Sequence, residues 1–157
     1  MAPQVSPEVT NLIRGKQNRY CRAVDAKIWE ELFDTVALPE ATFLYTHADG
    51  RVVTAALEGQ DQSLEYDFKS RAAFIAFFKA AFAPLQTIHT IDGGDFEQVS
   101  DTEVKAVFII MYFAGPQDPK AAIGHGCGGG HYHTTWKKVG DDWFLSSLKF
   151  VALYHRL

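Results

Sequence analysis

The stretch QTIHTIDGGDFEQVSDTEVKAVFIIMYF, residues 86–113, contains three runs rich in β-branched and aromatic residues, separated by two turn signals. The turns are predicted at residues 92–94 (Asp-Gly-Gly) and 100–101 (Ser-Asp), because these residue types favour the backbone conformations of tight turns. Strand alternation in the first run places His89 on the same face as Thr87. The stretch therefore predicts an antiparallel meander whose first strand carries a histidine.

Two further strands are predicted towards the C-terminus, at residues 131–139 and 143–154. Residues 140–142 (Gly-Asp-Asp) form the turn between them. A segment rich in glycine and proline, residues 115–130, precedes this pair. We interpret it as a long loop, and we interpret residues 124–133 (GHGCGGGHYH) as a flexible flap that lets substrate in.

The N-terminal part of the chain predicts one long amphipathic helix. Ser6 and Pro7 are typical of a helix start, with Ser6 as the N-cap. Apolar residues then recur at spacings of three and four as far as Val36, and Gly15 is a candidate kink near the helix start.

A hairpin and a second helix come next. Residues 49–50 (Asp-Gly) are a strong hairpin turn between predicted strands at residues 41–46 and 51–59. The second helix begins after Ser70 and ends before Pro84, and its phenylalanines cover more than one face, which predicts burial on two sides.

The order of the elements predicts an α+β fold. A long helix and a hairpin are followed by a second helix and then by an antiparallel meander, so the helices are expected to cover one face of a strongly curved sheet. At 157 residues, with no internal repeat and no linker, the chain is expected to form a single domain over residues 1–157.

Composition limits the classes of partner. The chain is 47% hydrophobic with twelve phenylalanines, enough to line an apolar cavity as well as a core. A net charge of −4 and the absence of a Lys/Arg run argue against nucleic acid and anionic membrane as partners. The chain shows no signal peptide and no membrane-spanning stretch, so we expect a soluble, cytoplasmic protein. Cys21 and Cys127 are expected to be free thiols.

Asp25 is the first candidate for chemistry, because it lies on the helical row Cys21-Asp25-Trp29 among apolar neighbours. A buried carboxylate must be hydrogen-bonded, paired or neutralised. The alternative is that Asp25 lies at the edge of the apolar stripe in solvent and pairs with Arg22 or Lys27. The helix pattern alone does not decide between them.

His89 is the second candidate, since it shares a strand face with residues that could border a cavity. It is either a hydrogen-bonded core histidine or a general base. A base needs a carboxylate that fixes the tautomer of the imidazole, and Asp25 is the one acid on an apolar helix face that could serve. Tyr45 and Tyr20 could donate hydrogen bonds to a substrate carbonyl, or could be half-buried structural tyrosines.

The segment GHGCGGGHYH, residues 124–133, allows a metal site on spacing alone, with His131 and His133 joined by His125 or Cys127. It contains no acidic ligand and its glycines leave the loop geometry open, so we predict no metal. It also lacks the Lys-Ser/Thr ending of a phosphate-binding loop, and nothing in it activates Cys127 as a nucleophile.

Three passages together resemble the SnoaL-like branch of the NTF2-like superfamily, and within it the scytalone dehydratases and the bile-acid dehydratases. They are RYCRAVDAKIWEELF (residues 19–33), QTIHTIDGGDFEQVSDTEVKAVF (86–108) and GHYHTTWKKVGDDWFLSSLKF (130–150). The resemblance implies a cone-shaped fold, in which a curved antiparallel sheet wraps around a long N-terminal helix and a second buried helix and encloses an apolar pocket. It also implies a homodimer or homotrimer that packs through the outer sheet face.

By this resemblance Asp25 and His89 match a catalytic Asp-His pair, Tyr45 matches a tyrosine that holds the substrate carbonyl, and Tyr20 matches a further pocket tyrosine. The chain departs from scytalone dehydratase in having Val24 before its aspartate, and an apolar run where that family has a second pocket histidine. Scytalone is therefore not assigned as the substrate. The substrate-binding residues that we expect are Tyr20, Trp29, Phe74, Phe78, Tyr132 and His133.

The resemblance implies a dehydratase or isomerase without a cofactor, which acts by His-Asp acid-base catalysis on a small apolar carbonyl intermediate of secondary metabolism, polyketide- or terpenoid-like. A polyketide or polyene cyclase on the same fold, including a pericyclic one, is the nearest rival. A non-catalytic binding or dimerisation module is the rival from a different class, and it would not need a buried Asp-His pair.

Overall fold

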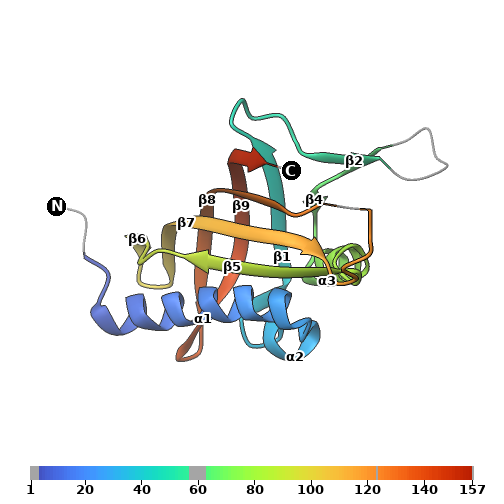
Figure 1. Cartoon of the computed structure of the whole chain (residues 1–157). Helices are drawn as coiled ribbons and strands as arrows, with labels where there is room; N and C mark the ends of the chain where they lie inside the picture. Colours follow the sequence, from blue (N-terminus) through green and yellow to red (C-terminus); the bar gives the residue numbers. More distant parts are fainter. Residues whose placement is uncertain (1–3, 57–62, 123, 157) are drawn as a thin grey trace.

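The computed structural model describes residues 4–56, 63–122 and 124–156. Within them the helices are α1 (Pro7–Ala26), α2 (Trp29–Phe33) and α3 (Arg71–Ala81) (Figure 1). The strands are β1 (Ala37–His47), β2 (Thr54–Ala56), β3 (Ser63–Glu65), β4 (Asp67–Phe68), β5 (Leu85–Ile91), β6 (Asp95–Ser100), β7 (Glu103–Pro116), β8 (Gly126–Val139) and β9 (Asp142–Arg156).

The main sheet has the strand order β4-β1-β9-β8-β7-β5, and β6 pairs with β7. It is curved but does not close into a barrel, and α1 runs along its concave side beside β5 (Figure 1). The predicted α+β fold with a curved antiparallel sheet is confirmed. The pairing of β1 with β9 is parallel, which a simple meander does not predict.

The single long helix expected over residues 7–36 is wrong, because α1 ends at Ala26. Lys27 adopts a left-handed backbone conformation with φ of 58°, and its N–H donates to the carbonyls of Ala23 and Val24. This is the usual geometry of a helix C-cap, although glycine rather than lysine is the common residue there. The chain then starts α2 in a new direction, and α1 passes through Gly15 without interruption.

Helix α1 lies antiparallel to β5 and is attached to it near both ends. At the C-terminal end, Nζ of Lys27 donates to the carbonyl of Leu85 at 2.6 Å. Towards the N-terminal end, Nε of Arg14 donates to the carbonyl of Gly93 at 2.7 Å, in the turn that follows β5. The Lys27 contact explains how a lysine is held in a conformation that costs energy for a residue with a Cβ atom.

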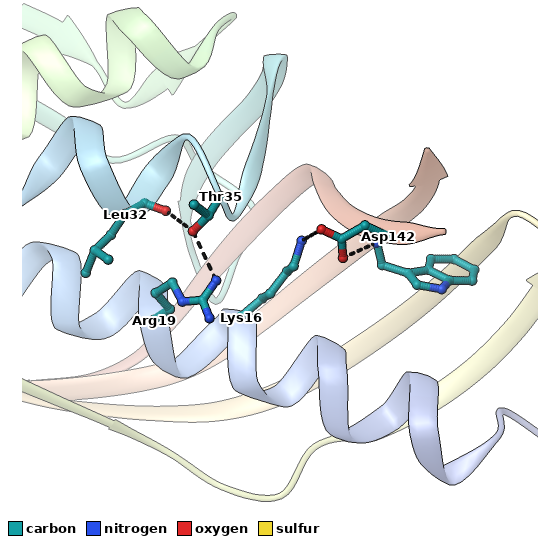
Figure 2. Close-up of polar contacts among 6 residues, drawn as sticks. Lys16, Arg19, Leu32, Thr35 and Asp142 are labelled. Carbon is teal, nitrogen blue, oxygen red and sulfur yellow. Dashed lines mark hydrogen bonds and ion pairs between the residues drawn. The ribbon is translucent and has the colours of Figure 1, made fainter. Parts of the chain in front are cut away.

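A second set of polar contacts ties α1 to β9 and to the segment before β1, as Figure 2 shows. Nζ of Lys16 lies 2.8 Å from a carboxylate oxygen of Asp142 and 3.8 Å from the centre of the Phe144 ring. Burial lowers the pKa of Lys16, and the Asp142 carboxylate opposes this shift. Arg19 donates to the hydroxyl of Thr35 at 3.1 Å. Helix α1 is therefore fixed on both sides of its axis.

The hairpin predicted around Asp49 and Gly50 forms only near its turn. Gly50 has a φ of 88°, and Thr46 and Val52 make a short antiparallel bridge. The chain then leaves β1, because β2 pairs with β3, while β1 is flanked by β4 and β9. Residues 57–59 of the predicted second strand lie outside the described residues.

The flexible flap expected over residues 124–133 is wrong, because β8 begins at Gly126. The long loop expected over residues 115–130 is shorter than predicted, since β7 extends to Pro116 and most of the glycines belong to β8. A Cβ atom at Gly130 would overlap the backbone carbonyl of Val151 on β9, and one at Gly129 would overlap that of Ile110 on β7. The β8–β9 register also shifts between Gly129 and Gly130. The glycines are there because neighbouring backbones approach too closely for a side chain.

Helix α3 confirms the second predicted helix, with the Ser70 side chain accepting the N–H of Ala73 as its N-cap. Phe74 and Phe78 are buried and stack into an aromatic cluster on β1, whereas Phe77 is only partly covered. The predicted burial on two sides is therefore uneven: the face that carries Phe74 and Phe78 is buried, and the face that carries Phe77 is only partly covered. Among the described residues, no helix combines the length and the apolar character that crossing a bilayer requires.

The convex face of the sheet exposes large apolar side chains on neighbouring strands. Ile88 on β5, Ile109, Met111 and Phe113 on β7 and Leu153 on β9 are all more than half exposed. The homodimer or homotrimer expected to pack through this face stays a prediction.

The burial of Lys16 gives a matched test of two ion pairs. The Lys16 side chain is 7% exposed and that of Lys79, which pairs with Glu30, is 54% exposed, at nearly equal N–O distances of 2.8 and 2.7 Å. We expect Asp142→Asn to lower the free energy of unfolding by about 1–3 kcal/mol, because a buried ammonium loses its partner. Glu30→Gln should cost about 0–1 kcal/mol. Urea denaturation measures both, and equal losses would contradict the structural role of Lys16.

The glycines of β8 give a second test. Gly130→Ala should lower the free energy of unfolding by about 1–3 kcal/mol or prevent folding, because its Cβ atom meets the backbone of β9. Gly124→Ala is the matched control, since a Cβ atom there meets nothing within 4 Å. Thermal unfolding followed by circular dichroism separates the two variants. Equal stability of both would mean that the glycine run is not an ordered part of β8.

Candidate active site

Asp25 and His89 form a hydrogen-bonded pair where the end of α1 meets β5. Oδ1 of Asp25 lies 2.6 Å from Nδ1 of His89 and accepts the Thr87 hydroxyl at 2.8 Å. Oδ2 accepts the backbone N–H of His89 at 2.9 Å. Three donors from β5 thus hold one carboxylate from α1. Of the two alternatives that the sequence left open for Asp25, the structure shows the hydrogen-bonded pair and not the solvated position.

The charge on Asp25 sets the tautomer of His89. Burial alone would raise the pKa of Asp25, but hydrogen bonds from the side chain and backbone of His89, and from Thr87, outweigh it and hold the pKa below its usual range. The carboxylate is therefore ionised at neutral pH, so Nδ1 of the neutral imidazole carries the proton. Nε2 keeps a free lone pair, and no residue in the described ranges hydrogen bonds to it.

His89 lies in the wall of a cavity of about 450 Å³. The wall is mostly aromatic and includes residues of α1, α3, β1, β5, β7, β8 and β9. Its ring-bearing side chains are Tyr20, Tyr45, His47, Tyr66, Phe74, Phe78, Phe82, His89, Tyr112, Tyr132, Phe150 and His155. The size suits a small organic molecule, and the predominance of rings favours one that is largely apolar.

A pair of tyrosine hydroxyls provides polar groups within this wall. The hydroxyl oxygens of Tyr20 and Tyr45 lie 3.2 Å apart. Burial raises the pKa of both, and of Tyr132, which packs edge-on against Tyr20. The phenols therefore stay protonated, and because each hydroxyl has one proton, the pair can share one hydrogen bond and direct the other to a bound oxygen.

The structure brings most of the predicted site residues together. Tyr20, Tyr45, Phe74, Phe78, His89 and Tyr132 all line the cavity, and Asp25 lies behind His89 as its hydrogen-bond partner. Their catalytic and substrate-binding roles stay predictions.

Two predicted pocket residues are placed elsewhere. Trp29 is 1% exposed and stacks on Phe33 inside the core. Because α1 ends at Ala26 and α2 runs in a new direction, Trp29 no longer lies on the helical row that carries Asp25. His133 points away from the cavity, since its neighbour Tyr132 points inward and successive strand residues face opposite sides.

The histidines of the glycine-rich segment do not gather into a metal site. The rings of His131 and His133 are 6.2 Å apart on the convex side of β8, and His125 lies against Gly115. Over residues 4–56, 63–122 and 124–156, no three His, Cys, Asp or Glu side chains are grouped closely enough to hold a metal ion.

Six ring side chains of the wall are not among the predicted site residues: His47, Tyr66, Phe82, Tyr112, Phe150 and His155. Tyr112 pairs with His89 across β5 and β7. Strand pairing was the signal that could have found it, but β6 lies between these strands in the sequence. His155 follows directly after the predicted end of the last strand, which extends further than the sequence pattern indicates.

Comparisons with known proteins agree with this architecture. The model of the SnoaL-like domain family matches residues 8–149. A protein of Gibberella zeae named "Probable cyclase FGR4" is 42% identical over 153 residues, which cover 98% of this chain and 97% of that protein.

Two solved structures show the same fold. A Novosphingobium aromaticivorans protein named after scytalone dehydratase superposes with a TM-score of 0.70 at 15% identity, over 93% of this chain and 85% of that one. An NTF2-like superfamily protein from Salmonella enterica superposes with a TM-score of 0.67 at 16% identity, over 94% and 93%. The family match and the shared fold lead to one conclusion: the chain belongs to the SnoaL-like domain family and has the NTF2-like fold.

Proposed function

We propose that this chain is an enzyme of lyase or isomerase type, which removes a proton from the carbon next to the carbonyl group of a small, largely apolar substrate. The observation that carries the proposal is the 2.6 Å contact between Asp25 and His89 at the wall of an aromatic cavity. A histidine with one nitrogen fixed by a carboxylate and the other free is a minimal oriented base. No cofactor is part of the proposal.

His89 would accept the substrate proton on Nε2. The imidazolium that forms is stabilised by the ionised Asp25, whose three hydrogen bonds keep it in place throughout the reaction. Because the surroundings are apolar, the attraction between the two charges is stronger than it would be in water.

Tyr20 and Tyr45 would hold the substrate carbonyl. When the α-proton leaves, negative charge develops on the carbonyl oxygen, and a phenol that is already aligned can stabilise it without reorganisation of solvent. The raised pKa of Tyr45 means that this group donates a hydrogen bond and does not itself give up its proton.

The fate of the resulting enolate decides the overall reaction. A hydroxyl group on the β-carbon would leave as water with a proton, which is dehydration, whereas reprotonation at another carbon is isomerisation. Attack of the enolate carbon on an electrophile within the same molecule is cyclisation. The name of the 42% identical relative favours cyclisation as the second candidate. An open cavity and a paired Asp25 speak against a purely structural module.

The base can be tested without knowledge of the natural substrate. The probe is 2-tetralone, an apolar bicyclic ketone whose protons next to the carbonyl exchange with D₂O, as followed by ¹H NMR. We expect the protein to accelerate this exchange, and His89→Gln and Asp25→Asn each to lower the enzymatic rate at least about a hundredfold.

The matched control for this test is His133→Gln, which removes a histidine from the convex face of the same sheet. This variant should catalyse the exchange of 2-tetralone at the wild-type rate. Circular dichroism shows whether each variant is folded. Wild-type exchange by a folded His89→Gln variant would eliminate the mechanism and leave a cavity that acts by shape alone.

The tyrosine pair gives a second prediction. Tyr45→Phe should slow the exchange of 2-tetralone by about 10–100-fold, because the developing enolate loses a donor. It should also weaken the binding of 2-naphthol, a stable analogue of the 2-tetralone enol, by about three- to tenfold in a fluorescence titration. Tyr154→Phe, on the exposed outer end of β9, serves as the control. If Tyr45→Phe behaves as this control does, the substrate carbonyl lies elsewhere.

A further inference from the structure

A row of paired residues crosses four neighbouring strands at one level of the cavity. His89 on β5 pairs with Tyr112 on β7, Tyr112 pairs with Gly128 on β8, and Gly128 pairs with His155 on β9. Directly paired residues point to the same face of a sheet. His89, Tyr112 and His155 accordingly all line the cavity.

Gly128 creates the gap that joins two members of this row. A Cβ atom at Gly128 would overlap the hydroxyl and the ring of Tyr112. Because that space is free, the Tyr112 ring lies across β8 and its hydroxyl comes within 3.3 Å of Nδ1 of His155, on the next strand. The glycine thus lets side chains from β7 and β9 meet over the strand that separates them.

In the tautomer of His155 that carries its proton on Nε2, Nδ1 accepts from the phenol, and the phenol oxygen is free to accept in turn. Burial, and to a smaller degree Cys127, raises the pKa of Tyr112, so its hydroxyl keeps its proton. When the phenol donates that proton to Nδ1 of His155, its own oxygen retains lone pairs that can accept from a ligand in the cavity, which Tyr112 lines. No described residue other than His155 hydrogen bonds to the Tyr112 hydroxyl.

Tyr112 and His155 are distinct from the tyrosine pair that would hold the carbonyl. Tyr20 is fully buried between α1 and the sheet and Tyr45 lies on β1, whereas Tyr112 is half-buried and His155 is exposed at the end of β9. Tyr112 is also the ring beside the base, with its centre 5.8 Å from that of His89. The cavity therefore has a second polar position beside His89.

We propose that Tyr112 and His155 form a second anchor, which binds a hydroxyl group of the substrate close to the carbon that His89 deprotonates. The location relative to that carbon rests on the proposed function. The substrate class is then narrower than an apolar ketone: it is a small carbonyl compound with a second, hydroxyl oxygen. That hydroxyl donates to the oxygen of Tyr112, whose own proton is held by His155.

Ligand pairs that differ by one hydroxyl test the anchor. The probes are 2-naphthol and the isomeric dihydroxynaphthalenes that keep its hydroxyl and add a second one, titrated by fluorescence. We expect at least one isomer to bind the wild type about three- to tenfold more tightly than 2-naphthol does. In Tyr112→Phe and in His155→Leu, the ratio of the two dissociation constants should fall to about one.

Two further variants make the test specific. Gly128→Ala should also bring the ratio of dissociation constants to about one, because the added Cβ atom displaces the Tyr112 ring. His133→Leu, on the convex face, should keep the wild-type ratio. Circular dichroism identifies any variant that fails to fold, and the other variants then decide. The proposal is overturned if no isomer binds more tightly than 2-naphthol, or if the gain persists in both folded Tyr112→Phe and His155→Leu.

The two proposals can fail separately. Exchange of 2-tetralone reports on His89 and needs only one oxygen on the ligand, whereas the ratio of dissociation constants reports on Tyr112 and His155 and needs no chemistry. If the second hydroxyl does not tighten binding while 2-tetralone exchanges at the expected rate, only the proposed anchor is refuted. A hydroxyl gain that survives without any exchange would remove the proposed base and leave a binding site for hydroxylated rings.

Discussion

The packing of α1 on the sheet depends on one carboxylate that needs hydrogen-bond donors at a position unfavourable for negative charge. Asp25 belongs to the last turn of α1, where the helix dipole presents negative charge and disfavours another anion. The chain offers no basic residue in that turn, so the compensation comes from β5, through the Thr87 hydroxyl and both the backbone and the ring of His89. The same three hydrogen bonds that keep the carboxylate ionised also position α1 on the sheet and orient the imidazole.

The abrupt end of α1 serves this contact. If the helix continued, Asp25 would lie in mid-helix and the following residues would run past the start of β5 in place of turning back towards the core. Lys27 prevents this with a left-handed backbone and a hydrogen bond to Leu85. Apolar periodicity continues through the break, so the pattern of residues alone predicts one helix. The deciding interaction is a tertiary contact with a strand more than fifty residues away, which local sequence cannot reveal.

Local signals were sufficient where local physics decides. The alternation in β5 put His89 and Thr87 on one face of the strand, and the serine caps and apolar spacing located the starts of α1 and α3. For the Asp25–His89 pair, the helix pattern offered Asp25 as a possible partner, and the resemblance to the SnoaL-like family matched the two residues to a catalytic pair. Side chains whose position depends on strand pairing were out of reach: Tyr112 and His155 meet only because β7, β8 and β9 align and residue 128 is glycine. The glycine run looked flexible for the same reason, since its role is to give space to neighbours that are distant in sequence.

The parallel pairing of β1 with β9 has a consequence for how the domain is made. Strand β1, which carries Tyr45, is synthesised early, whereas its parallel neighbour β9 follows all the other described strands. The cavity wall therefore remains incomplete until β9 is made. Contacts with so large a sequence separation slow folding and leave an unpaired edge exposed while translation proceeds. During synthesis β1 has only the two-residue β4 to pair with among the described strands. Nascent chains stalled before β9 should therefore be the form of this protein that most needs protection from aggregation.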